Sequence, residues 1–464
     1  MAEEVWMLQT KKADFKQIGA RFRIDPVTAR IIRNRGIEGE AAIDRYLNGT
    51  LDDLYDPMLL KDMERAVSIL CEAVDTGKKI RIVGDYDIDG VCSTYILLQA
   101  FERLGSDVDF EIPDRIKDGY GINESIIEQA HADGVEVILT CDNGISAFHQ
   151  VELAKKYGMT VVITDHHEVP LDGEKEKIPP ADAVIDPKQA DCPYPFPEIC
   201  GAVVAYKLVQ VLYARRGVPQ MEWLDLLEFA AIATVGDVMK LQDENRILVK
   251  YGLKKMAQTK NLGLRRLAEK NNLDLGAITA YHIGFVIGPC LNAGGRLKTA
   301  KEALALLRAQ SEEEAERLAE ELKELNDTRK DMTEQGTEAA KLQVESWYQK
   351  DKVLVVFLPE CHESLAGIIA GRLREYYQKP AIVLTRGEEA VKGSGRSIDE
   401  YHMFKKLTEV SDLLLKFGGH PLAAGLSLEE KNIDEFRRRL NENAGLTEED
   451  FKAKVWIDVP MPVG

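Results

Sequence analysis

Acidic side chains follow an apolar run of the sequence at a point where a helix is expected to begin. Asp85, Asp87 and Asp89 occupy alternate positions after the run Ile80–Val83. Three carboxylates so close together repel one another, and burying even one of them without a partner is unfavourable or raises its pKa. This spacing therefore indicates a bound cation or strong hydrogen-bond donors. One of the three is expected to cap the following helix, with Asp85 and Asp89 as the candidates.

Two further polar motifs have the same placement. The apolar stretch that ends at Cys141 precedes Asp142, and the next apolar stretch precedes Asp165, His166 and His167. Alone, Asp-Asn-Gly is usually a turn, and a pair of His is more often hydrogen-bonded structure than a set of metal ligands. The carboxyl ends of parallel strands, however, form one edge of a sheet, where ligands bind. Because independent turns would not gather these residue types at one edge, the motifs together predict a metal site.

Asp237, which follows another apolar run, is a candidate to complete this site. The predicted catalytic set is then Asp87, Asp89, Asp142, His166, His167 and Asp237. Carboxylates and imidazoles without cysteine suit hard or borderline ions, and this set can hold two ions about 3.5–4 Å apart. Mn²⁺ is the first expectation, and Mg²⁺ competes although it prefers oxygen ligands. Two such ions activate a water and clamp the oxygens of a displacement at phosphorus, so phosphoester hydrolysis is the predicted chemistry.

The elements that position these residues alternate regularly. Strands are expected at 80–83, 107–112, 135–141 and 159–164, and helices at 62–76, 91–104, 123–132 and 145–157. Strand alternating with helix predicts an α/β domain with a parallel sheet that is covered on both faces. The Pro-rich segment 168–197 is expected to be a loop, and 200–308 a mostly helical continuation of the domain.

The charged stretch 311–350 carries leucines at spacings of four and three and predicts a long helix with a narrow apolar stripe. It is either a solvated surface helix or a connector between two domains. Strands at 353–358 and 381–384, helices at 363–377 and 402–416, and a Gly-rich turn at 418–420 predict a second, smaller α/β domain. The expected division is an N-terminal appendage (1–60), a catalytic domain with its helical continuation (61–310), a connecting helix (311–350), the smaller domain (351–455) and the start of a missing or absent C-terminal region (456–464).

Composition narrows the cellular setting more than the function. The net charge of −18, from 60 basic and 78 acidic residues, requires a local basic surface for any nucleic-acid substrate. A cation-binding acidic cluster accounts for part of this excess, so a nuclease is neither favoured nor excluded. The seven cysteines include no CxxC pair, which argues against a disulfide framework and favours a reducing cytoplasm. Without an apolar run of about 18 residues or a signal-peptide core, neither membrane insertion nor export is expected.

The four motifs around Asp87-Asp89, Asp142, Asp165-His166-His167 and Asp237 resemble, in this order, those of the DHH phosphoesterases. Within this family the sequence is similar to the RecJ exonucleases, in 48–67, in 291–297 and in the smaller domain. The resemblance implies a 5′-to-3′ exonuclease that acts on single-stranded DNA in recombination and repair. It implies DNA with a 5′-phosphate as substrate, and a single-strand-binding protein and a helicase as candidate partners.

The resemblance also implies individual roles. Asp142 would bridge two ions, and Asp87, Asp89, His166 and Asp237 would be direct ligands. Asp85 and His167 are further candidate ligands, with contact to phosphate as the alternative for His167.

The smaller domain resembles the DHH-associated substrate-binding domain at Gly393–Ser397 and at Gly418–His420. Glycines beside Arg and Ser let backbone amides and a guanidinium approach a phosphate closely, although a run such as Gly393–Ser397 is as often an ordinary loop. The resemblance assigns Arg296, Ser394 and Arg396 to a terminal 5′-phosphate. It assigns His420 to the scissile region, with a cap or turn as the alternative.

Two competing functions stay open. A DHH hydrolase of short oligonucleotides, cyclic dinucleotides or polyphosphate would use the same metal chemistry, but the chain length and Val83, where small phosphatases of the family carry His, count against it. A catalytically silent scaffold would be expected to have lost ligands, and all four motifs are intact. Many RecJ proteins continue into an oligonucleotide-binding barrel, which would begin near 456–460 of this sequence, so affinity for long DNA is in question.

Overall fold

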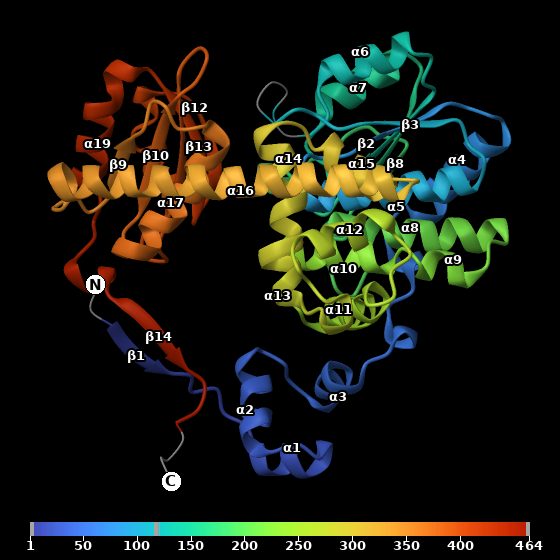
Figure 1. The fold of residues 1–464 in the computed structure, drawn as a ribbon, viewed down its shortest axis with the longest axis horizontal. Helices are drawn as coiled ribbons and strands as arrows, with labels where there is room; N and C mark the ends of the chain where they lie inside the picture. The colour runs from blue at the N-terminus through green and yellow to red at the C-terminus, as the bar shows by residue number, and fades with distance from the viewer. Residues whose placement is uncertain (1–3, 116–118, 120, 461–464) are drawn as a thin grey trace. The chain divides into compact units, whose positions relative to one another are not determined.

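The computed structural model describes residues 4–115, 119 and 121–460, and the chain divides into two compact units (Figure 1). One unit is Ile37–Asn326, and the other combines Met1–Gly36 with Asp327–Gly464. The division falls inside the long helix α16 (Glu312–Gln343), which a π-helical turn at Val344–Tyr348 continues. Over the described ranges, no helix has both the length and the apolar character that a membrane span requires.

The larger unit contains a five-stranded sheet in which all strands are parallel. Its order is β3-β2-β4-β5-β8, with β2 at Ile80–Val83, β3 at Val108–Glu111, β4 at Val137–Cys141, β5 at Thr160–Thr164 and β8 at Ala183–Ile185. The first four strands confirm the sequence prediction. The loop predicted at 168–197 is wrong in part, because β8 lies within it together with the short hairpin β6 (Leu171–Asp172) and β7 (Lys175–Glu176). Three apolar residues between prolines and acids give no strand periodicity.

Helices cover both faces of this sheet because successive strand residues point to opposite sides. Ile82 packs with α4 (Met63–Asp75), α5 (Ile88–Arg103) and α8 (Gly201–Arg216), whereas Val83 packs with α6 (Glu124–Ala132) and α7 (Phe148–Lys156). The expected helical continuation is confirmed. Its other members are α9 (Gln220–Leu224), α10 (Leu227–Gly236), α11 (Asp243–Met256), α12 (Leu262–Lys270), α13 (Ala280–His282), α14 (Gly288–Leu297) and α15 (Lys301–Arg308); α3 (Glu40–Asn48) precedes the sheet.

The smaller unit contains a mixed five-stranded sheet in the order β12-β13-β11-β10-β9. Its strands are β9 (Leu354–Phe357), β10 (Ala381–Arg386), β11 (Val391–Arg396), β12 (Leu414–His420) and β13 (Ala423–Leu428), and its helices include α17 (Glu363–Tyr377), α18 (Met403–Thr408) and α19 (Ile433–Glu442). Only β9 and β10 are parallel neighbours. A second α/β domain is therefore confirmed.

Two predictions in this unit are wrong in detail. The helix expected at 402–416 ends at Thr408, and the expected turn at Gly418–His420 is the end of strand β12. Gly393 and Gly395 also lie in a strand, β11, rather than in a loop. A Cβ on Gly393 would lie 2.5 Å from a methyl carbon of Leu384, so the glycine permits close packing within the sheet.

The first residues of the chain pair with the last described ones. Strand β1 (Glu4–Leu8) lies parallel to β14 (Ala453–Ile457), and Asn34 at the end of α2 (Pro26–Asn34) donates to Asp458; α1 (Phe15–Phe22) lies between β1 and α2 in sequence. The residues expected to form one appendage, 1–60, are thus divided between the two units. The last four residues of the expected C-terminal region lie outside the described residues.

Candidate metal centre

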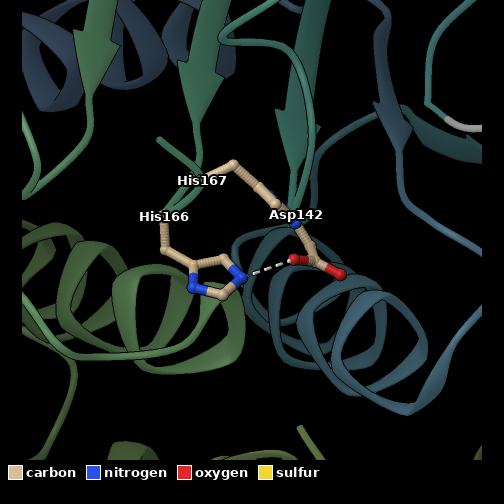
Figure 2. A group of neighbouring side chains, drawn as sticks. All are labelled: Asp142, His166 and His167. Atoms are coloured by element: carbon tan, nitrogen blue, oxygen red, sulfur yellow. Dashed lines mark ion pairs between the residues drawn. The ribbon is translucent and has the colours of Figure 1, made fainter. Parts of the chain in front are cut away.

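The acidic and His motifs meet at the carboxyl edge of the parallel sheet. The chain runs from β2 outward to β3 and then returns to β4 on the other side, so β2 and β4 flank a topological switch point, where open α/β sheets bind ligands. Asp85 follows β2, Asp142 follows β4 directly, and His166 follows β5. Figure 2 shows the His166 ring pointing at the Asp142 carboxylate.

The imidazole of His166 lies at the centre of this group. Its Nε2 atom is 3.1 Å from Asp142 Oδ1, 3.4 Å from Asp89 Oδ2 and 3.9 Å from Asp237 Oδ2. Three sets of potential ligand atoms each lie within 4.8 Å of one another. These sets are Asp142, His166 and His167; Asp89, His166 and Asp237; and Asp85, Asp87 and Asp142. The structure thus gathers all seven residues that the sequence singles out as candidate ligands.

Burial makes the ionised form of these carboxylates costly without a cation. Asp85 and Asp142 are 1% and 2% exposed. Burial and then the charge of Asp87 raise the pKa of Asp85 to about 8, and burial raises the pKa of Asp142 strongly as well. Burial, followed by Asp89 and Asp87, raises the pKa of Asp237 to about 8. A divalent cation would remove this penalty, so the group fits a metal site.

His166 has the protonation state that a metal ligand needs. Burial lowers its pKa, which keeps the imidazole neutral. Its Nδ1 atom is buried and has no hydrogen-bond partner within the described ranges, while Nε2 faces the carboxylates. A neutral ring among several acids is a donor for a cation rather than a charge partner.

Helix ends hold two of the acids in place. Asp87 caps α5, accepting hydrogen bonds from the backbone N–H groups of Asp89 and Gly90 at 2.9 and 3.1 Å. The prediction that Asp85 or Asp89 is the cap is therefore wrong, because the helix begins at Ile88, three residues before the expected start. Asp89 accepts from the backbone N–H groups of residues 201 and 202 at the N-terminus of α8, both at 2.7 Å. These donors and the positive end of the helix fix its carboxylate.

Glycine is required where α8 meets the group. A Cβ on Gly201 would lie 2.8 Å from the Cβ of Asp142, closer than non-bonded carbons approach. Asp142 itself has φ +62°, in the left-handed region that Asp and Asn tolerate better than most residues.

Asp165 organises the loop that carries both His side chains. Its carboxylate accepts from the backbone N–H groups of Ile145 at 2.8 Å, of His166 at 2.7 Å and of His167 at 3.2 Å, and it lies 2.8 Å from His167 Nδ1. Burial acts to raise its pKa, but the hydrogen bond and charge of His167 lower it below the ordinary value. The sequence motif contains Asp165, yet only its position after β5 could have suggested this role.

The two adjacent His side chains differ in charge and exposure. Burial disfavours the charged form of His167, but the hydrogen bond and charge of Asp165 raise its pKa to about 9. The side chain of His167 is 43% exposed, against 9% for His166. It lines a pocket of about 220 Å³ together with Gly144, Ile145 and Gln150. His167 is therefore a cation beside a small pocket, whereas His166 is a buried neutral ring.

We expect Asp165→Asn to lower phosphoester hydrolysis about 10- to 100-fold, as the loss of a residue that orients ligands usually does. The amide cannot accept hydrogen bonds from all of its present donors, and it carries no charge opposite His167. The pKa of His167 should fall from about 9 toward its ordinary value of 6.5, which NMR titration of the ring in metal-free protein measures. An unchanged His167 titration would contradict this role. Asp172→Asn, in the exposed hairpin strand β6, is the control.

The candidate substrate residues lie in both units. Arg296 is near the end of α14, and the preceding Gly295 contacts the loop that carries Asp85 and Asp87, since a Cβ there would lie 2.3 Å from the carbonyl oxygen of Tyr86. Arg296 is thus in the unit that holds the acidic group.

Ser394, Arg396 and His420 lie together in the smaller unit. Arg396 donates to Ser394 Oγ at 3.2 Å, and both approach Gly367 of α17. Arg396 and His420 are both in register with Ala423 of the strand between them. The three side-chain positions therefore share one end of this sheet.

Comparison with known proteins identifies two domain models in the chain. Residues 79–234 match the N-terminal domain of the DHH family, and residues 350–445 match the DHHA1 domain. The single-stranded-DNA-specific exonuclease RecJ of Bacillus subtilis is 38% identical over 96% of this chain, which spans 56% of that protein. RecJ of Haemophilus influenzae is 35% identical over 95% of this chain, which spans 79% of that protein. The crystal structure of Thermus thermophilus RecJ with Mn²⁺ matches 98% of this chain and 65% of its own, with a TM-score of 0.83 and 30% identity.

Proposed function

Because the chain belongs to the RecJ family of single-stranded-DNA-specific exonucleases, we propose that it removes nucleotides from single-stranded DNA in the 5′-to-3′ direction with two divalent ions. The observation that carries this proposal is the buried group of carboxylates around His166 at the switch point of the sheet. Relatives of this family have been crystallised with Mn²⁺ and with Mg²⁺, and we propose Mn²⁺ first because His ligands suit it better.

The ligand sets support a division between two ions. Asp142 belongs to the set with Asp85 and Asp87, and it also lies 3.1 Å from His166 of the other set. A carboxylate in this position can bridge, with Asp85 and Asp87 on one side and Asp89, His166 and Asp237 on the other. Two bound ions would lower the pKa of an attacking water and offset the charge of the phosphate in the transition state.

The chain's own side chains contribute further. The neutral ring of His166 donates electrons from Nε2 without bringing a competing proton. His167, as a cation held by Asp165, is suited to contact a non-bridging phosphate oxygen, and we assign it that role rather than metal ligation. Arg296, Ser394 and Arg396 would hold a terminal 5′-phosphate, and His420 would contact the scissile region. The smaller unit is thus proposed to bind substrate.

The proposal extends to the cellular setting. All seven cysteines are free thiols, which fits the reducing cytoplasm expected from the sequence. A single-strand-binding protein and a helicase that supplies unwound DNA are the proposed partners in recombination and repair.

The proposal is tested with a long single strand labelled at its 5′ or 3′ end, a matched duplex and a dinucleotide, each with Mn²⁺ or with a chelator. Rapid Mn²⁺-dependent release of the 5′ label from the single strand alone is expected. Activity confined to the dinucleotide would move the protein to the branch that hydrolyses small substrates. An absence of hydrolysis with any divalent ion would support a binding scaffold instead.

We expect Arg396→Ala to reduce the preference for a 5′-phosphorylated strand about tenfold, since charge-assisted hydrogen bonds to an anion contribute roughly 1.5–3 kcal/mol. Metal content should not change, because Arg396 lies in the smaller unit. The comparison is kcat/KM for 5′-phosphate and 5′-hydroxyl strands, with metal content measured in parallel. Arg386→Ala, on the neighbouring strand β10, is the matched control. Loss of metal in Arg396→Ala would contradict the proposed division of roles.

A further inference from the structure

A second pocket lies in the larger unit at the far ends of the helices that carry Asp89 and Asp237. It has a volume of about 560 Å³, within the usual range for small-molecule sites. Asp89 is in the first turn of α5, whereas the pocket is lined by Tyr95 and Arg103 further along that helix. Asp237 caps the end of α10, whereas the pocket is lined by the start of α10. Nine residues of helix span about 13 Å, so the pocket is separate from the metal centre.

A buried carboxylate with an unused acceptor lines this pocket. Glu228 is 3% exposed, and its Oε1 atom accepts from the hydroxyl of Thr259 at 2.7 Å. Its Oε2 atom is buried and has no hydrogen-bond partner in the part of the chain that the structure describes. Burial raises the pKa of Glu228 to about 7, although Thr259 and Lys255 act to lower it. Orphaned buried acceptors of this kind are rare in native proteins and point to a missing donor.

The neighbouring polar side chain in the pocket cannot supply that donor. Asn261 uses its amide N–H groups on Tyr95 Oη and on the carbonyl of Leu307, at 3.1 and 2.7 Å, and its Oδ1 atom accepts from the backbone of Leu264. A ligand that enters the pocket therefore meets Glu228 as an acceptor. The hydroxyl of Tyr95, which accepts from Asn261, can donate its own proton to a ligand oxygen.

The walls and the rim restrict what kind of ligand fits. Tyr95 and Phe229 line the pocket with rings whose centroids lie 4.3 Å apart, so they offer a flat ligand an apolar surface. Three cations, Arg103, Lys255 and Lys260, also line it, paired with Glu222 and Asp225. Lys260 and Arg103 are 81% and 53% exposed, whereas Glu228 is buried. The pocket thus combines an acidic interior, aromatic walls and an exposed rim with one more positive than negative charge.

We propose that this pocket binds a guanine nucleotide, with the base donating to Glu228 and the phosphate reaching the cations of the rim. Guanine presents two adjacent N–H donors, N1–H and the 2-amino group, which match the two oxygens of a carboxylate. The adjacent O6 atom can accept from Tyr95. Adenine presents an unprotonated N1 at the corresponding place, so it would set a lone pair against the carboxylate. This site is independent of the proposed nuclease activity.

The test is calorimetric titration of the full chain with GMP, dGMP, AMP and guanosine, in a chelator so that no nucleotide binds through a metal ion. GMP or dGMP should bind at least about tenfold more tightly than AMP, because a mismatched polar group in a buried site is strongly rejected. A deoxynucleotide preference would identify the products of DNA hydrolysis as the source, and a ribonucleotide preference the free nucleotide pool; either supports the site. Equal binding of GMP and AMP, or no binding, would overturn the proposal.

Three variants separate the parts of the site. Glu228→Gln, which keeps the shape but replaces an acceptor oxygen by an N–H donor, should weaken GMP at least tenfold. Lys260→Ala should reduce the advantage of GMP over guanosine while leaving the preference for guanosine over adenosine. Gln99→Trp, which fills the pocket without touching Glu228, should also block GMP, and it covers the case in which Glu228→Gln fails to fold. Undiminished GMP binding in folded Glu228→Gln or in Gln99→Trp would overturn the proposal.

Discussion

Replacing Asp142 by asparagine is expected to lower Mn²⁺-dependent hydrolysis of single-stranded DNA by about a thousandfold or more, near the upper end of losses seen when one charge-stabilising group is removed. Asp142 lies 3.1 Å from His166 and shares a ligand set with Asp85 and Asp87. A neutral amide at this position cannot bridge two cations. Asparagine is the informative replacement because it tolerates the backbone conformation at φ +62°, so the loop should keep its shape.

The measurement is kcat for release of the 5′ label, with metal content determined on the same samples. Asp172→Asn removes an exposed aspartate of the same unit and should leave both unchanged. Near-normal activity of Asp142→Asn would show that Asp142 is not a shared ligand. Loss of activity with both metals retained would assign it to a role in the transition state alone.

Metal binding is expected to reverse the pH dependence of stability. In a chelator, Asp85 and Asp237 have pKa values of about 8 in the folded protein, against an ordinary value of 3.8. The folded protein then holds protons that the unfolded chain has released between pH 4 and 8, so the free energy of unfolding falls as pH rises through this window. At 1.36 kcal/mol per pKa unit, and with the two groups coupled, the loss is on the order of 5 kcal/mol.

With excess Mn²⁺ the slope should have the opposite sign. Metal ligands must be deprotonated, so affinity rises with pH, and tighter binding to the folded state stabilises it. Urea unfolding at several pH values between 5 and 8, with Mn²⁺ or with a chelator, measures both slopes. The metal-dependent difference cancels the titration of all groups outside the centre. Equal slopes under the two conditions would mean that these carboxylates do not bind the ion.

The parts of the fold that depend on local pattern could be predicted from the sequence. Strands β2, β4 and β5 are short apolar runs directly before polar motifs, and parallel strands align those motifs at one edge. That rule is sufficient to place Asp85, Asp142 and His166 near one another.

Features that depend on distant partners could not be predicted. The pairing of β1 with β14 joins opposite ends of the described chain, and nothing in five residues specifies it. Strand β11 contains two glycines, which are unfavourable in strands on average, and only the packing of Leu384 against Gly393 explains them.

The same limit applies within the candidate site. That α8 delivers two backbone N–H groups to Asp89 depends on how residue 201 packs against Asp142. The different charges of His166 and His167 depend on the orientation of Asp165, because both rings have the same ordinary pKa. Sequence alone therefore identifies the residue types but not the state of each one.

The most direct test of the two-ion centre is a crystal structure of the protein grown with Mn²⁺, with anomalous scattering recorded near the manganese edge. We predict two anomalous peaks about 3.5–4 Å apart, both within bonding distance of Asp142, with His166 bound to one of them. A single peak, or manganese bound away from Asp142 and His166, would contradict the account.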